Sequence, residues 1–196
     1  SAFEWPGPAG TLQCSVDEPQ GTLRGVAVIC HPHPLYGGTM DNKVVQTLAR
    51  ALVQLGYRAV CFNFRGVGQS QGQWDEGRGE VDDALAVIAA QDAQLPLVLA
   101  GFSFGGYVAA AASKRLPPAH RLERLVLIAP ATSNYTLPAV SDHTLVIHGE
   151  QDDVVPLAAT LDWARPQSLP VTVIPGTGHF FHGQLVLLKN LLTRNW

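Results

Sequence analysis

Short apolar runs alternate along the chain with longer stretches whose apolar residues are spaced three or four positions apart. This alternation starts near residue 22 and predicts buried strands separated by amphipathic helices. The short runs are apolar at almost every position, which is typical of parallel strands in a sheet covered on both faces. The predicted strands are Gly25–Cys30, Tyr57–Phe64, Leu97–Gly101, Arg124–Ala129, Thr144–His148 and Val171–Ile174.

The clearest helical pattern lies in Asn42–Leu55, where Val44, Leu48 and Leu52 fall on one side and Gly56 follows the last turn. Glycine is common just past the C-terminus of a helix, because it adopts positive φ angles without strain. Strands that alternate with helices in this way indicate βαβ units and an α/β fold with a mostly parallel central sheet. The other predicted helices are Glu80–Ala93, Phe104–Leu116, Leu157–Arg165 and His179–Asn195.

The N-terminal segment Phe3–Pro19 has a different pattern. Its side chains alternate in polarity over Thr11–Val16, which predicts antiparallel strands at the edge of the sheet. No repeat, charge block or low-complexity linker interrupts the rest of the chain, and its 46% hydrophobic content can fill one sizeable core. We therefore expect residues 1–196 to form a single domain.

Charge and cysteine content exclude several classes of function. The net charge of −3 and the lack of a basic stripe argue against a nucleic-acid partner. The apolar runs are shorter than the roughly 20 residues of a membrane-spanning helix, so no span is predicted.

Cys14, Cys30 and Cys61 lie singly among apolar neighbours, which is typical of buried free thiols in a reducing compartment. No secretory signal stands at the start, so we expect a cytoplasmic protein, whose oligomeric state the sequence does not indicate.

A nucleophile elbow is the most specific local signal. Residues 101–106 read GFSFGG between a predicted strand and an Ala-rich predicted helix, as the G-x-S-x-G motif requires. In such a turn the serine, here Ser103, has a strained backbone, and the flanking glycines allow close backbone approach. The N–H of Phe104 is then predicted to bind the negative oxygen that forms during acyl transfer.

The acid and the base are expected after later strands, in the chain order serine, acid, histidine. Residues 148–156 read HGEQDDVVP and contain two carboxylates after a predicted strand. Asp152 is the predicted acid because of its place three residues after the glycine, as in similar G-x-x-D-x-x-V-P loops, and Asp153 is the alternative. His179 follows the last strand in a glycine-rich loop and is the predicted base. His182 is the weaker candidate, since it lies about one turn into the predicted final helix.

The loop after the first parallel strand reads HPHPLYGG at 31–38 and is expected to supply a second oxyanion donor. Its two prolines have no N–H to give. The N–H of Leu35 is the predicted donor, and those of His33 and Tyr36 are alternatives. His31 and His33 have no third ligand nearby in the sequence, so no metal site is predicted.

Five segments resemble the α/β-hydrolase superfamily, and together they extend over nearly the whole chain: HPHPLYGGTMDNKVV, FNFRGVGQSQG, GFSFGG, HGEQDDVVP and GTGHFF. The set is more narrowly similar to a group of small bacterial serine hydrolases that lack a lid and carry an HPHPxxGGTMxNKVV segment. The resemblance implies a cytoplasmic serine hydrolase with a triad of Ser103, Asp152 and His179. It implies no metal or organic cofactor.

The connection Pro130–Asp142 is too short to form the lid that larger lipases and peptidases carry at this point. We therefore expect an open site in which Tyr36, Tyr135 and Phe180 contact the substrate. The residues expected to line its mouth are Leu35, Tyr36, Phe104, Tyr135 and either Phe180 or Phe181. An open site favours small acyl esters over long buried chains, so a carboxylesterase acting through an acyl-enzyme is the predicted activity. A thioesterase, an acyltransferase, a short-peptide hydrolase and a non-catalytic binding protein on the same fold are the alternatives.

Overall fold

One eight-stranded sheet organises the computed structural model, which describes all residues 1–196. The strands are β1 (Ala2–Gly7), β2 (Gly10–Asp17), β3 (Gly25–Cys30), β4 (Tyr57–Phe62), β5 (Leu97–Phe102), β6 (Leu122–Ile128), β7 (Thr144–Gly149) and β8 (Thr172–Ile174). They lie in the order β1-β2-β4-β3-β5-β6-β7-β8. The strands from β3 to β8 run parallel, whereas β1 and β2 form the predicted antiparallel pair at the edge beside β4.

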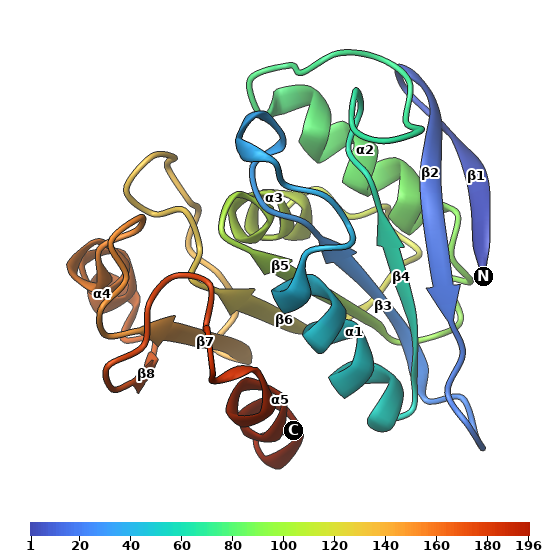
Figure 1. Ribbon diagram of the computed structural model, residues 1–196. Helices are drawn as coiled ribbons and strands as arrows, with labels where there is room; N and C mark the ends of the chain where they lie inside the picture. The colour runs from blue at the N-terminus through green and yellow to red at the C-terminus, as the bar shows by residue number, and fades with distance from the viewer.

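Helices cover both faces of this sheet, as Figure 1 shows. The helices are α1 (Lys43–Gln54), α2 (Arg78–Ala89), α3 (Phe104–Ser113), α4 (Leu157–Ala164) and α5 (Leu185–Arg194), with short 3-10 turns η1 (Pro34–Tyr36) and η2 (Arg165–Gln167). Buried side chains of α1 and α5 pack on one face, and those of α2, α3 and α4 pack on the other. These three layers confirm the α/β architecture with a mostly parallel sheet that the sequence predicts.

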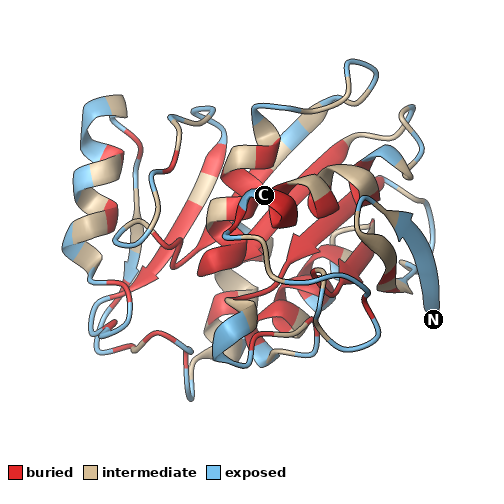
Figure 2. Ribbon diagram, turned by 90° about the horizontal axis from the view of Figure 1, so that it is seen from above, coloured by how far each residue is buried: buried red, intermediate tan, exposed pale blue.

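Neighbouring residues of the central strands point into opposite layers of the core. In β3, Val26 and Val28 belong to the cluster shared with α2 and α3, whereas Ala27 and Ile29 belong to the cluster shared with α1 and α5. Figure 2 shows the middle of the sheet buried along its length. Because both faces are covered, these strands need apolar residues at every position, which explains the continuous apolar runs. The three cysteines are also buried and unpaired, as expected.

The start of the last helix differs from the prediction. Helix α5 begins at Leu185 rather than at His179, and the residues between them form turns. Phe181 and Gly183 have φ angles of 54° and 75°, which an α-helix cannot accommodate. The catalytic candidate His179 therefore lies on a loop that connects β8 to α5.

The connection between β6 and β7 is short. Between β6 and β7, the segment Pro130–Asp142 contains turns but no helix or strand. The C-terminal edge of the sheet is thus left without a covering subdomain in this region. None of the helices has both the length and the apolar character needed to cross a bilayer.

Candidate active site

A sharp turn between β5 and α3 carries Ser103. Its backbone angles, φ 59° and ψ −119°, lie outside the regions that non-glycine residues normally occupy. Hydrogen bonds hold this strained conformation: the Ser103 N–H donates to the Ile128 oxygen, and the Ser103 oxygen accepts from the Gly106 N–H, both at 2.9 Å. A Cβ on Gly105 would lie 2.1 Å from the Cys30 carbonyl oxygen. Only glycine therefore fits where the turn meets the end of β3.

Two loops at the C-terminal ends of β7 and β8 contact each other closely. The N–H of Gln151 donates to the carbonyl oxygen of Thr177 at 2.9 Å. A Cβ on Gly149 would lie 2.3 Å from the same oxygen, so the loops approach as closely as glycine permits. This contact brings Asp152 and His179 together, although they are 27 residues apart in the sequence.

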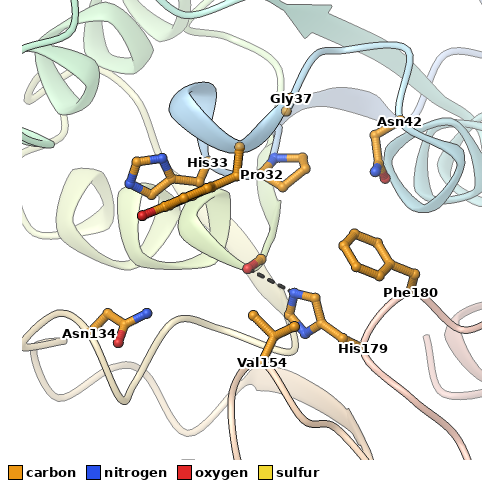
Figure 3. Close-up of a pocket in the computed structure, with 11 residues that line it drawn as sticks. Pro32, His33, Gly37, Asn42, Asn134, Val154, His179 and Phe180 are labelled. Atoms are coloured by element: carbon orange, nitrogen blue, oxygen red, sulfur yellow. Dashed lines mark hydrogen bonds between the residues drawn. The ribbon is translucent and has the colours of Figure 1, made fainter.

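The three predicted side chains form a continuous chain of hydrogen bonds. His179 Nδ1 lies 2.6 Å from Asp152 Oδ2, and His179 Nε2 lies 3.0 Å from Ser103 Oγ, the contact that is dashed in Figure 3. An ionised carboxylate only accepts hydrogen bonds, so Nδ1 carries the proton and donates it to Asp152. Nε2 then accepts from the serine hydroxyl. This tautomer has the free lone pair that is needed to take a proton from Ser103.

The surroundings of Asp152 keep it ionised. Its Oδ1 accepts from the N–H groups of Val154 and Val155 at 2.9 and 2.7 Å. Burial alone would raise the pKa of Asp152, but the hydrogen bonds from His179 and Val155 outweigh burial and lower this pKa below its ordinary value. The buried His148 lies beside the carboxylate and donates from Nε2 to the Val155 oxygen at 2.8 Å. Burial lowers the pKa of His148, so a neutral ring supports the Asp152 loop.

The two alternative candidates, Asp153 and His182, are not part of this chain of hydrogen bonds. The side chain of Asp153 is exposed and makes no hydrogen bond to a histidine, whereas its neighbour Asp152 is buried. His182 is also exposed, and its ring lies 6.2 Å from the ring of Phe180. The expectation that His182 lies inside the final helix is wrong, because α5 begins only at Leu185.

The loop after β3 changes the assignment of the second oxyanion donor. The N–H of Leu35, which the sequence favours, donates to His33 Nδ1 at 3.2 Å, and the N–H of Tyr36 donates to the His33 oxygen at 3.1 Å. The N–H of His33 makes no hydrogen bond within the protein. The other candidate donor, the N–H of Phe104, lies in the first turn of α3, where no intrahelical acceptor exists. Of the three candidates in the β3 loop, only His33 has a free N–H.

The chain is similar to known proteins in both sequence and fold. Residues 21–140 match the family described as serine aminopeptidase, S33. The chain belongs to this S33 family. An uncharacterized protein of Rickettsia prowazekii is 32% identical over 193 residues, which cover 89% of this chain and 79% of the relative.

Two solved structures resemble this S33 family member over its full length. A serine hydrolase without a lid from Xanthomonas campestris is 40% identical with a TM-score of 0.91, and covers 100% of this chain and 92% of its own. A serine hydrolase homologue from Coxiella burnetii is 42% identical with a TM-score of 0.88, and covers 100% of this chain and 96% of its own. The protein is therefore a hydrolase with the α/β-hydrolase fold and no lid.

A cavity of about 450 Å³ opens at Ser103 in this S33 hydrolase, within the size range of small-molecule sites. Of the residues expected to line its mouth, Tyr36 and Phe180 do so, whereas Leu35, Phe104, Tyr135 and Phe181 do not. The Tyr135 hydroxyl instead lies 3.1 Å from His33 Nε2. The lining residues are Pro32, His33, Tyr36, Gly37, Gly38, Asn42, Ser103, Asn134, Val154, His179 and Phe180.

The cavity is also lined by Asn42, Asn134 and Val154, which no motif in the sequence marks as site residues. The sequence marks Asn42 only as the start of a predicted helix. In the structure, its Oδ1 accepts from the N–H groups of Val44 and Val45 at 2.8 and 3.2 Å. These two bonds fix the orientation of the amide, which leaves its two N–H donors without a partner in the protein. In Figure 3, Asn42 and Asn134 lie on opposite sides of the cavity.

Proposed function

We propose that this S33 hydrolase cleaves small, uncharged carboxylic esters, with Ser103 as nucleophile, His179 as general base and Asp152 as the residue that orients the imidazole. The observation that carries the proposal is the hydrogen-bonded chain from Asp152 through His179 to Ser103 on a strained elbow. A strained backbone at a serine costs stability, and such strain is typical of functional sites.

The proposed reaction has two steps. Ser103 Oγ attacks the ester carbonyl carbon while His179 Nε2 takes the hydroxyl proton, and the N–H groups of Phe104 and His33 stabilise the oxyanion. The tetrahedral intermediate then expels the alcohol, which leaves with the proton from His179. In the second step His179 removes a proton from water as the water oxygen attacks the carbonyl carbon of the acyl-enzyme. The intermediate then expels the Ser103 oxygen, which takes the proton back from His179, and the carboxylic acid leaves.

The lining of the cavity supports a neutral substrate. It contains no Asp, Glu, Lys or Arg. An aminopeptidase has to hold the charged amino terminus of its substrate, and a charge taken from water needs a charged or strongly hydrogen-bonding partner. Although the family is described as serine aminopeptidase, an uncharged ester fits this site better. The exposed side chains of Tyr36 and Phe180 leave the cavity open at the rim, which favours short acyl groups.

The free amide donors of Asn42 are proposed to bind an oxygen of the substrate. Asn42→Asp keeps a good N-cap for α1, because aspartate also accepts the two backbone N–H groups, but it removes both donors. We expect the ratio of the KM for p-nitrophenyl methoxyacetate to the KM for p-nitrophenyl butyrate to be about tenfold higher in this variant than in the wild type. This is the size of effect expected for one lost hydrogen bond. The two esters have the same chain length and differ by one ether oxygen.

A neutral variant separates the effect of donors from that of charge. Asn42→Ser also caps a helix and carries no charge, and its short hydroxyl is occupied by the cap. The ratio of the two KM values should rise in this variant as well. An unchanged ratio in both variants would remove Asn42 from the substrate site.

The ester proposal is tested with p-nitrophenyl esters from acetate to dodecanoate, alongside a matched thioester and a matched anilide. We expect the highest kcat/KM with short acyl esters and a steep fall toward the long chains. Faster turnover of the thioester would favour the thioesterase alternative. Reaction with a fluorophosphonate without turnover of any ester would retain the activated serine and contradict the proposed substrate class.

A further inference from the structure

The side chain of His33 connects the loop after β3 to a distant part of the chain. Its Nδ1 accepts from the N–H of Leu35 at 3.2 Å, and its Nε2 lies 3.1 Å from the hydroxyl of Tyr135, 102 residues away. The His33 carbonyl accepts from the N–H groups of Tyr36 and Gly38 at 3.1 and 3.0 Å. Every polar group of His33 except its backbone N–H is therefore bonded within the protein.

These contacts define the protonation state of the ring. Nδ1 accepts from the Leu35 N–H, so it carries no proton, and Nε2 is the nitrogen that donates to Tyr135. Burial lowers the pKa of His33, while the nearby Glu76 acts in the opposite direction. A neutral ring is required here, because a protonated ring would offer Leu35 no acceptor.

Tyr135 itself is fixed relative to the nucleophile. The N–H of Ala131 donates to the Ser103 carbonyl oxygen at 3.1 Å, and the N–H of Tyr135 donates to the Ala131 oxygen at 3.1 Å. The ring of Tyr135 stacks on Tyr107 of α3 at 4.5 Å and packs edge-on against Phe104 at 5.4 Å. Through these contacts, the Tyr135 hydroxyl couples the ring of His33 to the serine elbow.

We infer that the hydrogen bond between His33 Nε2 and the Tyr135 hydroxyl, here called the His33–Tyr135 latch, positions the second oxyanion donor. The latch holds the His33 N–H in place relative to Ser103 before the substrate arrives. This inference rests on the proposed function, in which that N–H binds the oxyanion. Tyr135 does not line the cavity, so it is a positioning residue that acts through His33.

A preorganised donor stabilises the oxyanion because nothing has to rearrange while charge develops. A loosened donor therefore slows the chemical step, whereas binding of the neutral ester changes little. The latch predicts a loss in kcat with an almost constant KM. A residue that only supports the fold would lower the amount of active protein instead, and would leave kcat per active site unchanged.

The test compares Tyr135→Phe with Tyr107→Phe. Both variants keep their aromatic rings in the stack, but only Tyr135→Phe removes the hydroxyl that contacts His33. Rates are expressed per active site, counted by complete fluorophosphonate labelling. We expect Tyr135→Phe to lower both kcat and the fluorophosphonate labelling rate about tenfold with KM within about twofold, and Tyr107→Phe to match the wild type.

A second variant tests whether the two residues act as a pair. In His33→Asn the shorter side chain still accepts from Leu35 but cannot reach Tyr135. The double variant with Tyr135→Phe should then be no slower than the slower single variant, because both changes break the same bond. Wild-type rates in Tyr135→Phe, or losses that multiply in the double variant, would overturn the latch. A wild type that the fluorophosphonate does not label would instead contradict the proposed function itself.

Discussion

Ester turnover should fall by about 10⁴-fold or more when Ser103 is replaced by alanine, because the acyl-enzyme can no longer form. Only the Oγ atom is removed, and the Cβ and the strained backbone stay as they are. The hydroxyl makes one hydrogen bond, to His179, so we expect little change in the free energy of unfolding. Turnover of p-nitrophenyl acetate and urea unfolding of the same preparation measure the two effects separately.

Ser113→Ala is the matched control for this variant. Ser113 lies at the C-terminal end of α3, and its hydroxyl donates to the Ala110 carbonyl oxygen at 2.7 Å, far along the helix from the elbow. This control should keep the wild-type rate. Full activity in Ser103→Ala would show that another residue is the nucleophile.

The second large effect is expected from Asp152→Asn, which should lower kcat about 10⁴-fold at neutral pH. The N–H groups of Val154 and Val155 hold one side-chain oxygen in place, so the new amide nitrogen faces His179. That nitrogen donates, and His179 Nδ1 has to accept. The ring proton then moves to Nε2, where it blocks acceptance of the proton from Ser103.

Asp153→Asn is the control for the acid. This exposed neighbour has the same chemistry but makes no hydrogen bond to His179, so its substitution should leave kcat unchanged. Steady-state kinetics of both variants decide between the two carboxylates. Loss of activity in Asp153→Asn together with normal activity in Asp152→Asn would reverse the assignment of the acid.

The fold could be predicted because its signals are local. Gly25–Cys30 is a strand with the predicted bounds, since every one of its residues is buried between two helical layers. Parallel strands joined by helices place their C-terminal ends at one edge of the sheet, so loops that follow different strands meet there. This is why Ser103, Asp152 and His179 could be named together from the sequence, while their catalytic roles stay a prediction.

The end of β4 and the second oxyanion donor could not be predicted from the sequence, because both depend on contacts between distant groups. Strand β4 ends at Phe62 rather than at Phe64, because the Phe64 N–H donates to the ring of His31 at 3.1 Å. Leu35 is unavailable as an oxyanion donor because the ring of His33 accepts its N–H. No periodicity or motif indicates which side chain accepts a hydrogen bond from a given backbone N–H.

The proposed nucleophile is tested most directly by locating the adduct of a fluorophosphonate with mass spectrometry. We expect one adduct per chain on the tryptic peptide 79–114, with fragment ions that place it on Ser103 and not on Ser113. An adduct on another serine would contradict the proposed triad. Complete absence of labelling in the folded protein would contradict an activated serine at this site.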